Sequence, residues 1–533
     1  MADPVEVTPQ PGFNATPIIE IRGQNNFYYP DRRLKKENAE SLKNVNLTER
    51  GTARRRNGYA KYNTGQITEA TVAKPLVGLY QATYANGTVR NIEVAGTQIF
   101  TNDGTTRTNI TGTTTLTSDS ANSRCRFAFM EDAAFGTNDS DETFKITNAG
   151  VATDMTASVK VPWISCRDIV AHKNLLVVMN TVEYNTATEE NVRHPTRIRW
   201  PDVTQGSLGI DVTNFPTDSK MEVQEGGAPI LGGGNIGRES EGFLGVVKSD
   251  GVHLIEFILD GGFIEAVPRR QLTGNFEPIA KNGILHNPQF GLWVIARDGA
   301  YVVKPDLSFE LVTQGVQAEW NSLKKSQIQH AVSFVRQGDH QVRTLISTTG
   351  NSLYHDKVLV WDWESNDVWF DEPYDEMNYA DSWIKSSTEY DMFGSGDGYV
   401  HQGNDPDQSK DNGNDISWNI TMSPNDINLA GVDKTIHSVV THFVAVTGVQ
   451  SISFTAFLNE GRVASRTDVL SIGSDLKWND GTAWNSSGVT WPGEKTSLAR
   501  SFVNRVAQTV APQWEGDDNF ELKGYQVIFS RAE

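Results

Sequence analysis

One local pattern recurs through most of the chain: a run of alternating apolar and polar residues, a polar turn, and a second such run. Alternation places side chains on the two faces of a strand, and the Asp-Gly or Asn-Asp turns supply the positive φ that tight hairpins need. The pattern therefore predicts a series of β-hairpins. There are seven, at residues 90–100, 133–146, 175–179 with 197–200, 243–255, 292–303, 358–370 and 392–400.

The spacing of these hairpins points to a repeat architecture. They recur at intervals of roughly 35 to 65 residues, and one four-stranded blade of a β-propeller takes about 40 to 50 residues. We therefore predict an all-β chain whose body is a β-propeller of six to eight blades. The alternative is a set of unrelated hairpins in stacked sandwiches. Helical spacing is confined to residues 31–43, a solvated helix, and residues 316–323, two helical turns.

The rest of the chain divides around this body. Residues 1–73 form an N-terminal arm, 74–404 the propeller, 405–417 a polar linker and 418–533 a C-terminal β-sandwich. The linker is predicted because residues 405–415 contain no aliphatic or aromatic side chain. The sandwich is predicted from alternating strands at 437–446, 449–458 and 525–529.

Composition excludes several classes of protein. The chain of 533 residues has 47 Lys and Arg against 66 Asp and Glu, a net charge of −19. This charge argues against a protein that binds nucleic acid through many phosphate contacts. There is no apolar run of 18 residues, and residues 1–10 lack a signal-peptide pattern. The two cysteines, Cys125 and Cys166, are expected to be small buried residues. Stability must then come from packing or assembly.

Motifs that carry catalysis are weak here. Gly232 to Gly237 satisfies the G-x-G-x-x-G spacing, but a strand and not a helix follows, so we expect an inter-blade loop and no cofactor. Asp405, Asp407 and Asp411 lack the closing Glu of a calcium loop, so we expect no metal. The densest acidic run alternates with aromatic residues, which is typical of solvated strand faces opposite a core. It consists of Asp362, Glu364, Asp367, Asp371, Glu372, Asp375, Glu376 and Asp381. We therefore expect no enzyme.

One stretch is basic in this acidic chain. Residues 31–61 hold ten Lys and Arg against four Asp and Glu, a local charge of +6 that leaves −25 for the remainder. Such a stretch is either a solvated helix and loop or a docking surface for an acidic partner. The residues that we assign to docking are Arg54, Arg55 and Arg56, with Lys35 and Lys36.

Residues 44–59, Asn-Val-Asn-Leu-Thr-Glu-Arg-Gly-Thr-Ala-Arg-Arg-Arg-Asn-Gly-Tyr, carry a family resemblance. They resemble an N-terminal signature of the tail nozzle, or hub, proteins of short-tailed bacteriophages, which include the packaged-DNA-stabilisation type. In that signature an Asn-rich strand, a Gly turn, a basic pair and a Gly-aromatic step precede a propeller. Where the family often has Pro-Gly, this chain has Asn57 and Gly58. The resemblance extends loosely through the hairpins to about residue 392.

The resemblance implies a structural virion protein. Family members form a hexameric tube beneath a dodecameric adaptor ring, retain the packaged genome, later conduct its DNA into the host, and carry fibres or spikes. An acidic lumen repels DNA, so the duplex can slide through it. The virion tail would be the final location, after assembly in the bacterial cytoplasm.

Two other functions remain open. In a receptor-binding or fibre-attachment protein, Trp478, Trp484 and Trp491 would contact glycans or fibres, although a buried loop anchor explains the same residues. In a propeller hydrolase, two carboxylates of the acidic run would cleave surface polysaccharide.

Overall fold

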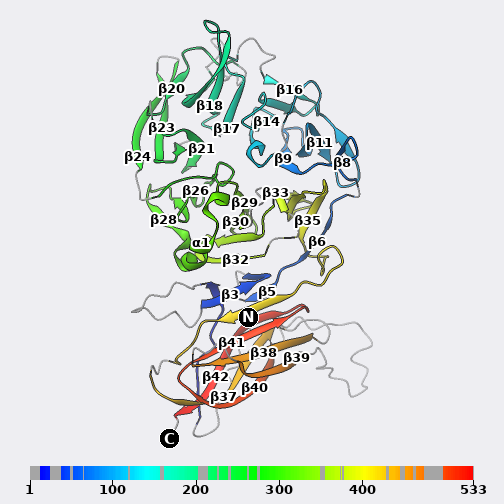
Figure 1. Cartoon of the computed structure of the whole chain (residues 1–533), viewed down its shortest axis with the longest axis vertical. Coiled ribbons are helices and arrows are strands. Elements are labelled where there is room, and N and C mark those ends of the chain that lie inside the picture. The colour runs from blue at the N-terminus through cyan, green and yellow to red at the C-terminus, as the bar shows by residue number, and fades with distance from the viewer. Residues whose placement is uncertain are drawn as a thin grey trace.

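The computed structural model shows an all-β protein with two bodies stacked along its long axis (Figure 1). It describes residues 13–24, 38–47, 52–63, 65–117, 120–155, 161–201, 214–224, 227–237, 242–260, 263–272, 276–348, 354–372, 374, 377–427, 431–444, 450–459, 464–472 and 496–531. The larger body is a ring of four-stranded sheets. The smaller body is a sandwich that holds the C-terminal strands.

Seven antiparallel four-stranded sheets form the ring, so the propeller has seven blades. Blade 1 consists of β9 (Leu76–Thr83), β10 (Val89–Ala95), β11 (Gln98–Asn102) and β12 (Arg107–Asn109), and blade 2 of β13 (Arg126–Met130), β14 (Ala133–Thr137), β15 (Phe144–Thr147) and β16 (Ala152–Asp154). Blade 3 consists of β17 (Ser165–His172), β18 (Leu175–Asn185), β19 (Glu190–Arg199) and β20 (Lys220–Glu222), and blade 4 of β21 (Ile230–Ile236), β22 (Phe243–Lys248), β23 (Gly251–Asp260) and β24 (Phe263–Leu272). Blade 5 consists of β25 (Leu285–Asn287), β26 (Gly291–Ile295), β27 (Ala300–Val303) and β28 (Phe309–Leu311). Blade 6 consists of β29 (Val332–Arg336), β30 (Gln341–Ile346), β31 (Lys357–Asp362) and β32 (Asp367–Asp371). Blade 7 consists of β33 (Met377–Lys385), β34 (Thr388–Ser395), β35 (Val400–Asp405) and β6 (Gly58–Lys61).

All seven predicted hairpins are antiparallel neighbours within a blade. Six of them are the second and third strands of their sheets, and residues 358–370 are the third and fourth strands of blade 6. Each hairpin is local in sequence, which is why alternation and turn residues were enough to find it.

A strand from the N-terminal part closes the ring. Blade 7 takes its outermost strand, β6, from residues that precede blade 1, and β6 pairs with β35. The first and last parts of the propeller are thereby held together by backbone hydrogen bonds. A small hairpin of β7 (Thr68–Glu69) and β8 (Val72–Ala73) lies between β6 and blade 1.

Polar contacts tie both neighbouring and non-adjacent blades to one another. Arg126 of blade 2 donates from Nε to Asp168 of blade 3 at 2.9 Å and from Nη1 to the Ile284 carbonyl, next to blade 5, at 2.7 Å. The buried Arg124 donates to Asn378 Oδ1 of blade 7 at 3.0 Å. These bonds connect the blades through buried side chains, in addition to the packing between neighbouring sheets.

Two six-stranded sheets form the sandwich. The first has the order β4 (Val45–Leu47), β5 (Ala53–Arg55), β42 (Glu521–Arg531), β37 (Lys434–Val444), β40 (Thr496–Ala507), with β1 (Asn14–Ala15) also paired to β42. The second has the order β2 (Arg22–Gln24), β3 (Asn38–Lys43), β36 (Trp418–Met422), β41 (Val510–Gly516), β38 (Gln450–Leu458), β39 (Ala464–Ile472). Trp514 of the second sheet lies against Tyr525 of the first, with ring centroids 5.5 Å apart.

The N-terminal segment differs from the predicted arm. Strands β1 to β5 are built into the sandwich, and β6 belongs to the propeller, so residues 14–61 are shared between the two bodies. The predicted linker, residues 405–417, lies between β35, which ends at Asp405, and β36, which begins at Trp418.

The two predicted helices have opposite outcomes. Helical residues occupy η3 (Val312–Val316), α1 (Gln317–Ser322) and α2 (Lys325–Ile328), and Val316, Trp320 and Leu323 are all buried as expected. The helix predicted at residues 31–43 is wrong for its described part, because residues 38–43 form β3, paired with β36. Cross-strand pairing outweighs the weak helical pattern there. A further short helix is η1 (Ala121–Ser123).

Candidate functional site: the joint between propeller and sandwich

The segment that carries the family resemblance, residues 44–59, forms the joint between the two bodies. It leaves the sandwich as the β4–β5 hairpin and enters the propeller as β6. Gly58 is required at the crossing, because a Cβ there would lie 2.1 Å from the Lys410 carbonyl oxygen. The Tyr59 ring then packs edge-on against Tyr374 and Phe393 of the propeller.

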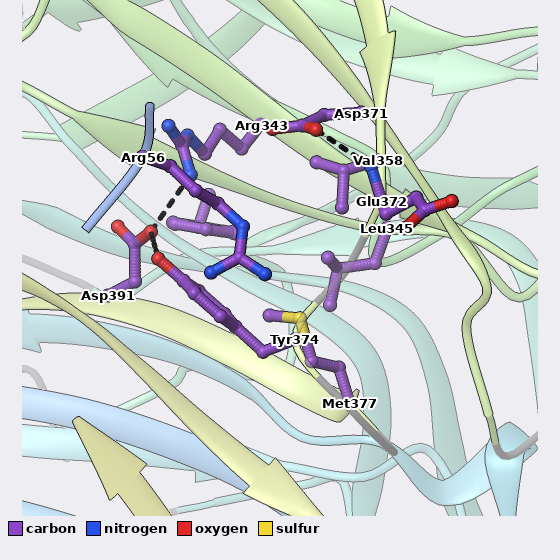
Figure 2. Close-up of a pocket in the computed structure, with 10 residues that line it drawn as sticks. Arg56, Arg343, Leu345, Val358, Asp371, Glu372, Tyr374, Met377 and Asp391 are labelled. Atoms are coloured by element: carbon purple, nitrogen blue, oxygen red, sulfur yellow. Dashed lines mark hydrogen bonds and ion pairs between the residues drawn. The ribbon is translucent and has the colours of Figure 1, made fainter. Parts of the chain in front are cut away.

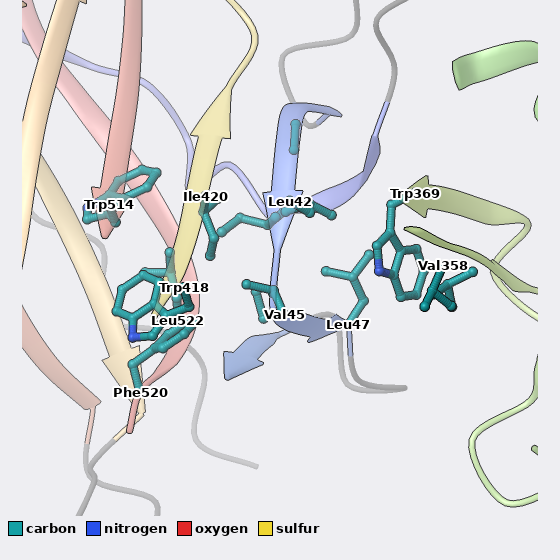
Figure 3. Packing of buried hydrophobic residues seen from close by; sticks show 14 of the residues in the cluster. Leu42, Val45, Leu47, Val358, Trp369, Trp418, Ile420, Trp514, Phe520 and Leu522 are labelled. Atoms are coloured by element: carbon teal, nitrogen blue, oxygen red, sulfur yellow. The ribbon is translucent and has the colours of Figure 1, made fainter. Parts of the chain in front are cut away.

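A continuous apolar core runs through this joint. Figure 3 shows Leu42, Val45 and Leu47 between Trp418 and its neighbours on the sandwich side and Trp369 on the propeller side. All five residues belong to one buried cluster. Domains move freely when their interface is small and polar, so this shared core fixes the angle between the two bodies.

Arg56 is the polar centre of the joint. Its guanidinium makes two hydrogen bonds to the Asp411 carboxylate, at 2.8 and 2.5 Å, and a third from Nε to Asn44 Oδ1 at 2.8 Å. It also lies over the Tyr374 ring, with Cζ 4.6 Å from the centroid (Figure 2). Burial by itself lowers the pKa of Arg56, but the hydrogen bonds to Asp411 raise it overall. One side chain thus binds the sandwich, the linker and the propeller.

Arg55 fastens the linker to the sandwich. Its Nη1 donates to the Asp517 carbonyl at 2.5 Å and its Nη2 to the Ser409 carbonyl at 2.8 Å. The side chain is buried, and that burial lowers its pKa. Arg55 therefore provides hydrogen-bond donors to two backbone carbonyl groups, of Asp517 and Ser409, that lie outside the strands.

The propeller contributes its own buried charges beside Arg56. Arg343 donates to Asp391 at 2.9 Å and to Asn46 Oδ1 of the sandwich at 3.0 Å, and Tyr374 donates its hydroxyl to the same Asp391 at 3.2 Å (Figure 2). Asp371 accepts the Asn44 backbone N–H at 2.6 Å. The cavity beside them offers about 10 Å³ to the centre of a water molecule. About 10–15 Å³ is needed to hold one water, so the joint is closely filled.

The sandwich also covers the outer edge of blade 6. Strands β2 and β3 pack against β32, and a Cβ on Gly23 would lie 2.8 Å from the Val368 backbone nitrogen. Lys43 pairs with Glu372 at 3.0 Å across the same contact. An uncovered sheet edge invites pairing with other chains, and here the sandwich occupies it.

The structure separates the residues assigned to docking. Arg54 is exposed. Arg55 and Arg56 are buried in contacts within the chain, which corrects their assignment to a docking surface. Arg54 and Arg55 are neighbours in β5, so their side chains point to opposite faces of the sheet. Arg56 lies beyond the end of β5 and is buried at the joint. Lys35, Lys36, Trp478, Trp484 and Trp491 lie outside the described residues.

The partners of Arg56 were not found from the sequence. Asp411 lies in the polar linker and is 355 positions away from Arg56, and no local pattern links the two. For Asn44 the residue type was a weak indication, because Asn adopts the left-handed backbone conformation more readily than most residues. Asn44 has this conformation here, with a φ of 54°.

The remaining motifs singled out in the sequence make contacts within the chain. Gly232, Gly233 and Gly234 lie in β21, an inner strand and not the loop that we predicted, where a Cβ on Gly232 would lie 2.5 Å from Asp168 Oδ2. In the acidic run, Asp371 bonds to Asn44, and Asp362 accepts the backbone N–H groups of its own turn. Asp371 thus serves the joint, and Asp362 serves a hairpin turn.

Two further observations concern cysteines and metals. Cys125 and Cys166 are buried free thiols, as expected, and burial raises the pKa of each to about 12. Among the described residues, no group of three or more His, Cys, Asp or Glu side chains is placed to hold a metal ion. Within the same ranges no helix is both long and apolar enough to cross a membrane.

The seven sheets and the fused sandwich define the class of protein: a seven-bladed β-propeller joined rigidly to a β-sandwich. No protein-family model matches the chain, and no curated protein matches it. Among solved structures, the chain is similar to the Pan2 WD40 domain of Neurospora crassa, with 10% identity, 67% of this chain and 97% of that chain covered, and a TM-score of 0.37. It is also similar to BBS1N in a complex with ARL6DN, with 10% identity, coverage of 65% and 97%, and a TM-score of 0.39. The fold assignment rests on the sheets themselves.

Proposed function

We propose that this chain is a structural virion protein, the tail nozzle of a short-tailed bacteriophage, and that it is not an enzyme. The observation that carries the proposal is the joint. The residues that resemble the nozzle signature, 44–59, are the ones that close the propeller with β6 and supply the β4–β5 hairpin of the sandwich. Because this short signature joins the propeller to the sandwich, its presence supports the same architecture in this chain as in the nozzle proteins.

The joint also suits a subunit of an assembly that is under mechanical stress. In our proposal the chain forms a homohexamer under an adaptor ring, retains the packaged genome and carries fibres or spikes. A subunit in such a particle must keep its shape under internal pressure. The continuous core and the Arg56 contacts give the two bodies one fixed arrangement.

The distribution of charge supports passage of DNA. Residues 58–405, which run from β6 through blade 7, hold 27 Lys and Arg against 44 Asp and Glu, a net charge of −17. Propellers arranged around a lumen would present this charge to DNA, which repels it and leaves it free to slide. The proposed location is the virion tail, after assembly in the bacterial cytoplasm.

Docking on the adaptor ring is assigned to Arg54 and to the basic residues that precede β3, including Lys35 and Lys36. An acidic surface on the partner would complement them. Because Arg55 and Arg56 are committed to contacts within the chain, replacing them would disturb the joint and not only the docking surface.

Electron microscopy of the purified protein with its adaptor partner tests the proposal. We expect six-fold rings with a central lumen, attached to the adaptor. Arg54→Glu should weaken attachment without changing the melting temperature of the chain. Persistence of a monomer in the presence of the adaptor would overturn the proposal.

A further inference from the structure

The outer face of β40 is the least explained surface of the sandwich. In β40, Ser501, Val503 and Ala507 point inward and are buried, whereas Phe502 is 51% exposed and Val506 is 55% exposed. Single exposed apolar residues are ordinary. Two of this size on one face of one strand, flanked by arginines, form a patch with the composition of an interface.

The arginines complete this patch. Arg500 and Arg505 are both exposed, and Arg500 lies with Cζ 6.0 Å from the Phe502 ring centroid. Aromatic and arginine side chains dominate the binding energy of protein interfaces, because they combine apolar area with charge or hydrogen-bonding groups. The register with β37 places Arg505 opposite the buried Ile436, so it points to the other side of the strand from Val506 but remains exposed on this edge strand. We call Arg500, Phe502 and Val506, together with the adjacent Arg505, the β40 patch.

The position of β40 leaves the patch accessible. Among the described strands β40 is the last in its sheet, at the opposite end from β4 and β5, which form the joint. The patch is therefore separated from the propeller of its own chain by the width of the sheet (Figure 1). A partner that binds there does not compete with the joint.

The backbone of β40 is poorly suited to adding a strand. Its register with β37 shifts between Ile436 and Ser438, and Asn504 has a φ of 49°, so β40 carries a bulge at the centre of the patch. Bulges and charged side chains protect an edge strand from pairing with other chains. Recognition must therefore use the side chains of the patch.

We propose that the β40 patch binds the acidic propeller of a second copy of this chain. The propeller has a net charge of −17, whereas the other residues, with 20 Lys and Arg against 22 Asp and Glu, carry only −2. A patch with two arginines is thus complementary to a propeller and not to another sandwich. Contact between two different surfaces of identical subunits is the kind that closes a ring.

This inference rests on the proposed nozzle function and adds the surface that links its subunits. The test compares the full-length chain with two double variants, Phe502→Ser with Val506→Ser and Arg500→Glu with Arg505→Glu. Val469→Ser is the matched control, because Val469 is 66% exposed but lies in β39, in the other sheet of the sandwich. Thermal melting establishes that each variant remains folded, as expected for exposed positions.

Sedimentation velocity over a range of protein concentration and salt measures assembly. We expect both double variants to raise the concentration needed for assembly by at least about tenfold, and Val469→Ser to leave it unchanged. Added salt should weaken assembly of the wild type more than that of the Arg500→Glu, Arg505→Glu variant. Rings formed equally well by all variants would overturn the β40 patch and leave the nozzle proposal standing. A wild-type chain that stays monomeric with its adaptor would overturn both.

Discussion

At the scale of single residues, Arg56 shows how one side chain can serve three structural elements. Its five N–H donors form a rigid planar fork, and this fork reaches the linker carboxylate, the sandwich amide and an aromatic face of the propeller together. A lysine has the same charge but lacks this geometry. The joint therefore depends on the shape of the guanidinium as well as on its charge.

Replacing Arg56 tests this role directly. Arg56→Ala leaves Asp411 and Asn44 without their partner, and removal of one member of a buried pair costs about 3 kcal/mol. We expect Arg56→Lys to recover only part of that loss. Urea unfolding followed by tryptophan fluorescence measures both. Arg54→Ala is the matched control, because Arg54 is exposed and its loss should cost less than about 0.5 kcal/mol. Equal stability of the Arg56→Ala and Arg54→Ala variants would contradict the assignment.

Asp381 makes the stability of blade 7 sensitive to pH. Burial, with a smaller contribution from the Glu389 carboxylate, raises the pKa of this carboxyl from 3.8 to about 7. The folded chain therefore holds a proton that the unfolded chain releases, and stability falls as pH rises from about 4 to about 7. Asp381→Asn removes this dependence. Melting curves should show the variant equal to the wild type near pH 4 and more stable at pH 8, by about 2 kcal/mol. A constant difference across this range would refute the assignment.

At the scale of elements, β6 decides whether the propeller closes. It is four residues long, and its first residue, Gly58, touches the linker backbone. Such a short strand contributes few hydrogen bonds, so its position depends on close packing of the residues around it.

Gly58→Ala should therefore open the ring. The added methyl group would lie 2.1 Å from the Lys410 carbonyl oxygen, and that oxygen belongs to backbone that cannot rotate away. We expect a loss of about 2 kcal/mol or more, in the range of overpacked positions, and faster protease cleavage within residues 58–75. Gly65→Ala is the control, since its nearest neighbour, Arg107 Nη1, is at 3.5 Å. If the two variants melt alike, β6 does not depend on this contact.

Strand pairs that are close in the sequence could be predicted from it, whereas pairs between distant strands could not. Hairpins such as 243–255 were predictable because both strands and the turn lie within a dozen residues. The pairing of β6 with β35 joins Lys61 to His401, and no local pattern reports a partner so distant. For the same reason the sequence did not predict the joint, where Arg56 bonds to Asp411. It also did not predict that β1 to β5 belong to the sandwich. The sequence showed that residues 44–59 were unusual, but only packing shows which of their side chains are buried.

At the scale of the whole molecule, the fold redistributes the charge. The stretch 31–61 has a charge of +6 in the sequence, but Lys43, Arg55 and Arg56 are engaged within the chain, two of them in ion pairs with Glu372 and Asp411. The acidic excess of −17 lies in the propeller. The molecule is therefore strongly polarised between an acidic ring and a nearly neutral sandwich. This polarity favours contacts between unlike bodies of neighbouring copies.

The two bodies also depend on each other for folding, because the N-terminal segment supplies five of the twelve strands of the sandwich. A chain that lacks residues 1–57 keeps β6 and every strand of the propeller, but exposes Ile420, Trp418 and Leu522 where β3, β4 and β5 had covered them. We expect limited proteolysis of this truncated chain to leave a resistant propeller of about 350 residues, consistent with its own core, and to degrade residues 418–533. In the full-length chain both parts should resist. A truncated chain whose residues 418–533 survive digestion would show that the C-terminal strands fold unaided, and β1 to β5 would then be additions to a complete sandwich.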